Sequence, residues 1–216
     1  NSLISDKKIT DKAFDWQNEF PEVFKGNNPG FDVIIGNPPY IRPEKLKGET
    51  RNYYLNSKEF EYTFGRFDLY ILFIERALKL LKNGGYLSFI IPSSFLNQNY
   101  SKKLRKLILE SYKIINIIDL SDIKVFRSAT VQTSIIVIQK TKTINNYKFN
   151  IKKPSSLSDF NKSKQETSIS QKVFLEMSNN MIRSDLRDKD LNLIKNIEKE
   201  SIPLSDICYI VIGMVP

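Results

Sequence analysis

The sequence predicts an α/β fold, in which buried strands alternate with helices along the chain. The apolar run at residues 31–36 is typical of a buried strand. Apolar residues then recur every three or four positions across residues 68–82, which predicts an amphipathic helix. A second apolar run at residues 86–91 follows directly after the turn signal Asn83-Gly84-Gly85. A strand, a helix and a second strand therefore follow one another in the first half of the chain.

The segment before the first strand is expected to be mostly irregular. Residues 1–12 are polar and are expected to form an irregular or frayed lead-in. Residues 14–24 contain five large apolar side chains, which favours a hydrophobic flap that packs on the sheet. The alternative is that Asp15 or Glu19 reaches into a binding site. Residues 27–30 carry a turn signal and lead into the strand.

The first strand ends in the tetrapeptide Asn37-Pro38-Pro39-Tyr40. Gly36 lets the chain turn, and the two prolines stop the strand because neither has an N–H to donate. Open α/β sheets bind their ligands at this end of the strands. The Asn37 side-chain oxygen and the Pro38 carbonyl oxygen would accept both hydrogens of one amine, such as the exocyclic amine of adenine. Two such bonds would localise the lone pair on the amine nitrogen.

Tyr40 would stack on the face of the same base, which must be flipped out of a duplex to reach this corner. The alternative interpretation of the tetrapeptide is a rigid turn that carries a surface tyrosine.

Basic and aromatic residues are mixed between residues 41 and 67. Arg42 and Arg51 lie nearest the tetrapeptide and are the candidates for contacts with phosphate groups. A solvated connection with an aromatic anchor is the alternative. In the helix that follows, Asp68 is the expected N-cap and Lys82 is expected in the last turn.

Further elements follow in the second half of the chain. A helix is predicted at about 101–111, where Lys102 and Arg105 belong to a basic face that is either solvated or in contact with phosphate. A strand follows at residues 114–119, and a loop that contains Phe126 leads into another strand. The remaining elements are expected to be an edge strand at residues 147–151, an exposed loop at 155–170 and a helix at 186–200.

Composition excludes several classes of chemistry. The chain has 216 residues, and 33 basic against 24 acidic residues give a net charge of +9, which favours a polyanionic partner. It contains no histidine, so histidine-based metal sites and histidine-dependent nucleophiles cannot form within it, and no metal is expected. The single cysteine, Cys208, is expected to be a small buried residue and fits a reducing cytoplasm. No apolar run reaches the length of a membrane span, and no membrane partner is expected.

The tetrapeptide at Asn37 resembles the catalytic motif of amino-group DNA methyltransferases of the gamma order, which methylate adenine at N6. Residues 13–24 resemble the lead-in of the large adenine methyltransferases of restriction-modification systems, the fused type IIG kind. The similarity extends from about residue 13 to residue 140. It implies the C-terminal half of a Rossmann-like, S-adenosylmethionine-dependent methyltransferase sheet with flanking helices.

The resemblance also implies roles for individual residues. Asn37, Pro38, Pro39 and Tyr40 would be catalytic, and Phe126 would stack on the base face opposite Tyr40. Phe73 would pack on the adenine of the cofactor, and Pro92 would mark the end of a strand beside it. If the family resemblance is set aside, the alternative interpretation is that Phe73 is a core residue and that Phe126 anchors its loop.

The likeness divides the chain into three parts. Residues 1–150 would be the catalytic part of the methyltransferase domain, residues 151–200 a linker and a helix, and residues 201–216 the start of a target-recognition domain. The sequence contains no glycine-rich cofactor loop, so the main S-adenosylmethionine pocket is expected upstream of residue 1.

The implied partners are double-stranded DNA and, in the same longer polypeptide, the target-recognition domain and a nuclease domain where one is fused. The fragment alone is expected to be inactive. The alternative functions are methylation of RNA or of protein glutamine, and a methyltransferase fold kept only as a DNA-binding module.

Overall fold

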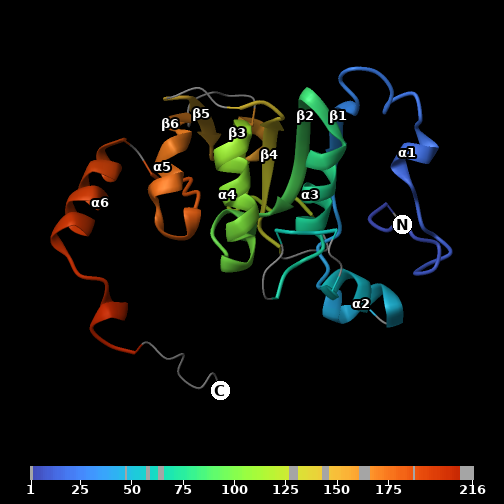
Figure 1. Ribbon diagram of the computed structural model, residues 1–216. Coiled ribbons are helices and arrows are strands. Elements are labelled where there is room, and N and C mark those ends of the chain that lie inside the picture. The colour runs from blue at the N-terminus through green and yellow to red at the C-terminus, as the bar shows by residue number, and fades with distance from the viewer. Residues whose placement is uncertain are drawn as a thin grey trace. The chain divides into compact units, whose positions relative to one another are not determined.

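The computed structural model describes residues 2–46, 48–56, 59–62, 66–126, 131–142, 146–160, 166–186 and 188–209. The chain forms two compact units, residues 1–184 and residues 185–216, which are described separately. The first unit contains the sheet and the helices that pack on it (Figure 1). Within its described part, the second unit contains the helix α6 (Asp188–Glu200) and a 3-10 turn at Leu204–Asp206.

The first unit is built on one mixed sheet with the strand order β1-β2-β4-β3-β5-β6. Its strands are β1 (Phe31–Gly36), β2 (Leu81–Pro92), β3 (Lys113–Asp119), β4 (Thr133–Gln139), β5 (Lys148–Lys152) and β6 (Glu166–Ser170). β1 is parallel to β2 and β3 is parallel to β5, whereas the β2–β4, β3–β4 and β5–β6 pairs are antiparallel. In the described part of the chain, β1 forms one edge of this sheet and pairs only with β2.

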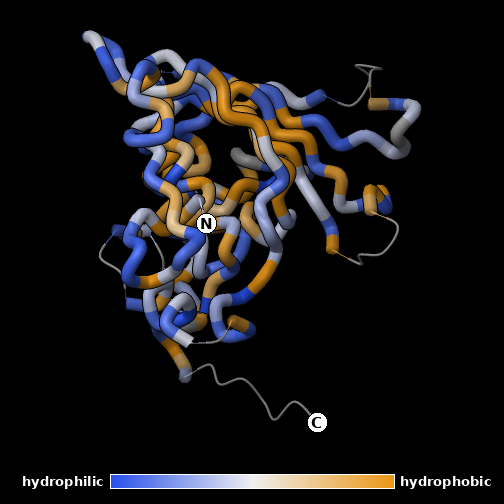
Figure 2. Tube along the Cα trace, turned by 90° about the vertical axis from the view of Figure 1, so that its right-hand side faces the viewer, coloured by the Kyte–Doolittle hydropathy of each residue, from blue (hydrophilic) through white to orange (hydrophobic). Residues whose placement is uncertain are grey.

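The helices of this unit are α1 (Trp16–Glu19), α2 (Gly48–Asn56), α3 (Tyr70–Leu80), α4 (Lys102–Ser111) and α5 (Gln171–Glu176). In Figure 1, α3 lies beside β1 and β2, and α4 lies in front of β3. The strand side chains on that face form the core, and they include Leu87, Ile91, Ile136 and Ile117, each at most 2% exposed. Figure 2 shows hydrophobic stretches, in orange, that run next to one another in the upper part of the view.

The opposite face of the sheet is less covered near β1. Val33 is 52% exposed, Ile35 is 77% exposed and Tyr86 on β2 is 41% exposed. These residues share one face, because Val33 pairs with Tyr86 and Ile35 pairs with Ser88. The burial along β1 and β2 therefore alternates between a core face and an open face, as the period of a strand requires.

The turn between α3 and β2 differs from the prediction. The chain becomes extended at Leu81, so Asn83-Gly84-Gly85 lies within β2 instead of ending the helix. Phe31 pairs with Leu81 but Val33 pairs with Tyr86, so residues 82–85 bulge opposite Asp32. A Cβ on Gly85 would lie 2.8 Å from the Phe31 carbonyl oxygen, so this glycine allows the two strands to approach.

Residues 2–12 are irregular, as the sequence predicts, and they are anchored, because Leu3 and Ile4 are buried and the Ile4 carbonyl accepts a hydrogen bond from Phe14 N–H. Three further predictions need correction. The Asp68 side chain makes no cap hydrogen bond to α3, and Lys82 lies in β2, where its ammonium pairs with Asp32. Cys208, in the second unit, is exposed.

The predicted domain boundary at residue 150 falls inside β5. This strand is not an edge, because β6 pairs with its outer side through residues that were predicted as a loop. The Phe149 and Phe174 rings also pack together, with centroids 5.9 Å apart. The first unit therefore continues to Ser184, and the segment from residue 151 onward is not simply a linker.

Candidate active site

The tetrapeptide Asn37-Pro38-Pro39-Tyr40 follows the carboxyl end of β1, at the edge of the sheet. Gly36 precedes it, and a Cβ at this position would lie only 3.0 Å from the Phe89 ring on β2, so glycine lets that ring pack beneath the strand end. Asn37 is exposed and Pro38 is buried. The Asn37 amide and the Pro38 carbonyl make no hydrogen bond to any described residue, and both residues line the same cavity.

Tyr40 is held in place by its hydroxyl group and by its ring. The hydroxyl donates to the Ile90 carbonyl at 3.1 Å, and the ring packs edge-on against Tyr70 with centroids 6.4 Å apart. Burial raises the pKa of the Tyr40 phenol to about 12, so the hydroxyl stays protonated and donates at neutral pH. The ring orientation is therefore fixed by contacts to β2 and α3.

Phe126 lies beside Tyr40, as the resemblance implies, but the two rings are not parallel. Their centroids are 6.4 Å apart and their planes meet at 70°. A base stacked between parallel rings needs two spacings of about 3.4 Å, or about 7 Å between the rings. The structure brings the two rings together in direct edge-to-face contact, so one ring must turn before a purine can enter between them.

A cavity of about 410 Å³ borders the tetrapeptide. Its lining includes Asn37, Pro38, Pro39, Phe73 on α3 and Trp16 on α1. The volume lies within the range of small-molecule sites, which are about 300–1,000 Å³ and mostly apolar. Phe73 thus shares one hollow with the tetrapeptide. Pro92 ends β2, as the resemblance implies, and does not line this cavity.

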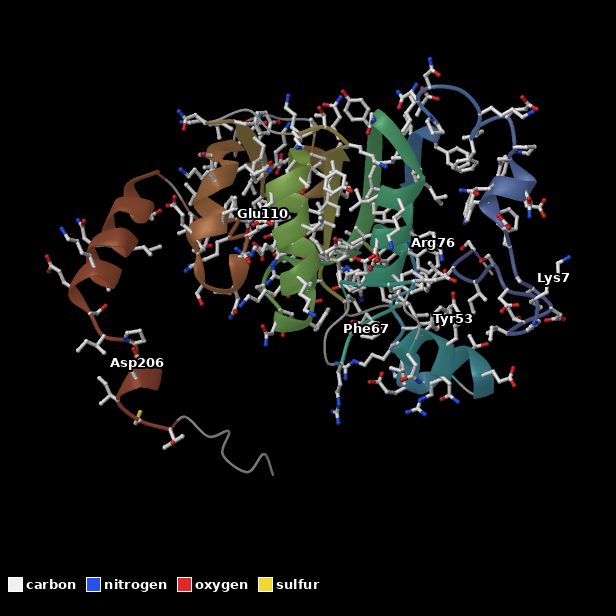
Figure 3. All side chains as sticks on the ribbon, in the orientation of Figure 1. Lys7, Tyr53, Phe67, Arg76, Glu110 and Asp206 are labelled. Atoms are coloured by element: carbon white, nitrogen blue, oxygen red, sulfur yellow. The ribbon has the colours of Figure 1, made fainter. Side chains whose placement is uncertain are left out.

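Arg76 lines the same cavity from α3, one turn after Phe73. In Figure 3 its labelled side chain lies between α3 and the N-terminal segment, where Nη2 donates to the Leu3 carbonyl at 3.0 Å and contacts the Glu59 carboxylate. The Arg76 Nε atom is buried and has no hydrogen-bond acceptor among the described residues. Because buried donors are nearly always paired in proteins, this unpaired N–H indicates a missing partner.

A hydrogen-bonded cluster supports Tyr70, the residue behind Tyr40. The Tyr100 hydroxyl lies 2.9 Å from the Tyr70 hydroxyl and 2.9 Å from Ser94 Oγ, and it donates to Asp68 at 3.4 Å. Burial raises the pKa of the Asp68 carboxyl, although the Arg42 guanidinium opposes this. The cluster joins the start of α3 to the segment after β2, and its member Tyr70 packs against Tyr40.

The four residues predicted to contact phosphate groups differ in their exposure to solvent. The Arg42 side chain is 56% exposed and lies 3.9 Å from the Asp68 carboxylate, and Lys102 is exposed at the start of α4. The Arg51 Nε is buried and unpaired in the described part of the chain.

Arg105 was wrongly assigned to a surface. It is fully buried and donates to five oxygen atoms, including the carbonyls of Phe95, Asn179 and Asn180. Burial lowers its pKa to about 10, which leaves the guanidinium charged at neutral pH. The residue therefore joins α4 to two neighbouring segments and cannot reach a phosphate group.

The N-terminal aromatic residues form the hydrophobic flap that the sequence favours. The Phe14, Trp16, Phe20 and Phe24 rings cluster around Phe31 and one another. The Asp15 carboxylate caps α1 by accepting from Gln17 and Asn18 N–H, and Glu19 is exposed, so neither lines the cavity.

Sequence reasoning missed Arg76, Trp16 and the Tyr70–Tyr100 contact as parts of the site. The three-residue spacing of Phe73 and Arg76 could have placed Arg76 on the same helix face. Nothing in the sequence could have shown that Nε is unpaired. Within the described ranges, no group of histidine, cysteine and acidic side chains could hold a metal ion. The described helices also include none that is long and apolar enough to cross a bilayer.

Comparisons with known proteins find the same kind of protein as the tetrapeptide motif indicates. A family described as Eco57I restriction-modification methylase matches residues 1–126. The chain is 36% identical over 118 residues to the type II restriction enzyme and methyltransferase RM.Eco57I of Escherichia coli, covering 54% of this chain and 12% of that protein. It is also 36% identical over 142 residues to the type II methyltransferase M.BstVI of Geobacillus stearothermophilus, covering 66% of this chain and 24% of the relative.

Among solved structures, the methyltransferase subunit of a type I restriction-modification system from Streptococcus thermophilus superposes with a TM-score of 0.45 at 21% identity. That match covers 80% of this chain and 33% of the other. The chain spans between about an eighth and a quarter of the length of the two curated relatives.

Proposed function

Because the chain belongs to the Eco57I restriction-modification methylase family, we propose that it is the catalytic part of a site-specific DNA methyltransferase that acts on the N6 amine of adenine. The observation that carries the proposal is the state of the tetrapeptide. The Asn37 amide is exposed and unbonded in the described part of the chain, and it lines the same cavity as Phe73.

The chemistry follows from the two oxygen atoms at the strand end. The Asn37 side-chain oxygen and the Pro38 carbonyl oxygen would accept the two N–H groups of the amine, which localises its lone pair for attack. Such preorganised acceptors stabilise the charge that develops in the transition state. S-adenosylmethionine supplies an electrophilic methyl group when it is bound.

Tyr40 would stack on the flipped base, and Phe126 would close on the other face after its ring turns. Stacking of a base on an aromatic side chain contributes about 1–3 kcal/mol, which offsets much of the cost of unstacking the base.

The cavity fits part of the cofactor. Its volume, its aromatic lining and the unpaired Arg76 Nε suit a planar heterocycle that carries hydrogen-bond acceptors. Phe73 would hold that ring, and Asn37 would lie where the methyl group meets the base.

We further propose that the rest of the cofactor pocket comes from sequence outside these 216 residues. The chain contains no glycine-rich loop, and it covers only 12% and 24% of the two relatives. The exposed apolar residues on β1 are also typical of a strand that another strand or helix covers.

The test uses Asn37→Ala in the complete polypeptide that carries these residues. We expect methyl transfer to fall by about 10²–10³-fold, the usual effect of removing one group that stabilises transition-state charge, while DNA binding is unchanged. Asn37→Asp is the matched variant, because it keeps an acceptor oxygen and should retain more activity than the alanine variant.

The readout is radiolabelled methyl transfer to DNA, RNA and protein, followed by identification of the methylated base. N6-methyladenine in DNA supports the proposal. Methylation of RNA or protein alone would reassign the substrate, and full activity of Asn37→Ala would refute the mechanism. A wild-type protein that binds DNA without methylating any substrate would indicate a DNA-binding module.

A further inference from the structure

We propose that Arg76 is a cofactor-binding residue, and that its Nε–H donates a hydrogen bond to a ring nitrogen of the purine in the methyl donor. The inference rests on the proposed function and extends it to a residue that neither the tetrapeptide nor the family likeness identified. Three observations carry it: the position of Arg76 in the cavity, the way its guanidinium is held, and the buried Nε–H that has no partner among the described residues.

The position follows from helix geometry. Phe73, Arg76, Ala77 and Leu80 all line the cavity from α3, with the three- and four-residue spacing that places side chains on one helix face. On the other side, the cavity is lined by Asn37, Pro38 and Pro39 at the strand end and by Trp16 in the N-terminal segment. A ring that packs on Phe73 therefore lies one helical turn from the Arg76 side chain.

The guanidinium is fixed by groups outside the cavity lining. Nη2 donates to the Leu3 carbonyl at 3.0 Å and contacts the Glu59 carboxylate, and the guanidinium carbon lies 5.3 Å from the Phe60 ring centroid. The segment that carries Glu59 is itself anchored, because the buried Glu75 carboxylate accepts N–H from Glu61 at 2.9 Å and from Tyr62 at 3.3 Å. These contacts preorganise the side chain before any ligand binds.

One buried donor of this fixed group has no partner among the described residues. Arg76 Nε is shielded from solvent, and no described residue offers it an acceptor. An unmade hydrogen bond of a buried charged group is costly, so such an atom in a cavity wall is expected to be satisfied by a ligand. The ligand must offer a lone pair close to an aromatic face. A purine offers this combination, because its ring nitrogens are acceptors in the plane of the ring that Phe73 would cover.

Direct binding of S-adenosylhomocysteine to the complete polypeptide tests the inference without any need for turnover. Arg76→Leu should weaken binding by about tenfold to a hundredfold, the effect expected for one hydrogen bond from a charged donor. Arg76→Lys keeps the positive charge near the Leu3 carbonyl and Glu59 but has no Nε–H, so it should fold like the wild type and lose similar affinity. Lys106→Ala is the control, because it removes an exposed cation on α4 that pairs with Glu110 and does not line the cavity.

Analogues of S-adenosylhomocysteine in which one purine nitrogen is replaced by C–H make the test specific. The wild type should bind one of these deaza analogues about tenfold or more weaker than the parent, and Arg76→Leu should bind that analogue and the parent equally well. Thermal denaturation without ligand checks that each variant is folded.

Two results would overturn the inference in different ways. In the first case, the wild type binds S-adenosylhomocysteine and both Arg76 variants bind it as tightly as the wild type does, or the variants discriminate the deaza analogues as the wild type does. Either outcome refutes the role of Arg76 and leaves the proposed function standing. If the wild type binds no S-adenosylhomocysteine, the cofactor assignment fails together with this inference.

Discussion

At the scale of single residues, the polar groups of the candidate site are of two kinds: some have no hydrogen-bond partner among the described residues, and others are held by a hydrogen bond to the protein. Asn37 makes no hydrogen bond to the described residues, whereas Tyr40 donates to the Ile90 carbonyl and packs on Tyr70. This contrast is consistent with a site in which Asn37 can hydrogen-bond to a ligand while Tyr40 is held in place by the protein. The Tyr40 ring and the Tyr40 hydroxyl can therefore be tested separately.

Tyr40→Phe keeps the ring and removes one hydrogen bond, so stability should fall by only about 1 kcal/mol and methyl transfer should change little. Tyr40→Ala removes the stacking surface and should lower target-base binding by about 1–3 kcal/mol. Fluorescence of 2-aminopurine at the target position reports stacking of the flipped base. Equal signals from the two variants would contradict a stacking role for the ring.

The raised pKa of Tyr40 also predicts a pH effect on stability. Below pH 10 the phenol is protonated in both the folded and the unfolded chain, so it contributes no pH dependence. Between pH 10 and about 12 the unfolded chain loses this proton first, and the folded state loses stability as the pH rises. Urea unfolding at pH 9 and pH 11 should show a larger loss for the wild type than for Tyr40→Phe, and equal losses would contradict the burial of this hydroxyl.

At the scale of secondary-structure elements, α4 shows how one helix can carry a structural and an exposed cation three residues apart. Arg105 is fully buried and bonded to five oxygens, while Lys102 is exposed at the first position of the helix. The two residues look equivalent in the sequence. Their burial gives them opposite expected effects on stability and on DNA binding.

Arg105→Ala should destabilise the fold by about 3 kcal/mol or more, because it leaves several buried carbonyl groups without a donor. Lys102→Ala should change stability by less than about 0.5 kcal/mol and, if α4 faces DNA, should lower the salt dependence of DNA binding by about one unit of slope. Chemical denaturation and DNA titrations at several salt concentrations measure both effects. An Arg105→Ala variant with wild-type stability would contradict the buried hydrogen-bond cluster.

At the scale of the whole molecule, the first unit depends on strands from both ends of its sequence. β5 lies between β3 and β6, and the Phe149 ring packs against Phe174 on α5. A chain that stops at residue 150 would lose β6 and α5 and would cut β5. The boundary at Ser184 is therefore the one that keeps the sheet intact.

Two truncated chains test this boundary. Residues 1–184 should unfold in one cooperative transition close to that of the first unit in the longer chain, whereas residues 1–150 should lack a cooperative transition and expose apolar surface. Circular dichroism during heating and binding of a hydrophobic dye distinguish the two. A cooperative transition for residues 1–150 would show that β6 and α5 are dispensable.

The sequence alone determined the features that depend on local chemistry. The apolar run before Asn37, the proline-locked tetrapeptide and the three- and four-residue spacing in α3 each specify a backbone state within a few residues, so the strand, the corner and the helix were predictable. The pairing of Tyr40 with Phe126 followed from the family resemblance, but their edge-to-face geometry did not. Asp68, the predicted cap of α3, instead accepts a hydrogen bond from Tyr100, because local propensity competes with partners that the fold brings close.

Tertiary structure alone decided which polar side chains are buried and what they meet. Arg105 and Lys102 have the same charge, and the packing of α4 against residues 95–101 and 179–180 buries only Arg105. Arg76 became a site residue because Leu3 and Glu59, 73 and 17 positions away, fix its guanidinium and leave Nε unpaired beside the cavity. Contacts between residues so distant in sequence depend on how the whole chain packs, and no local pattern encodes them.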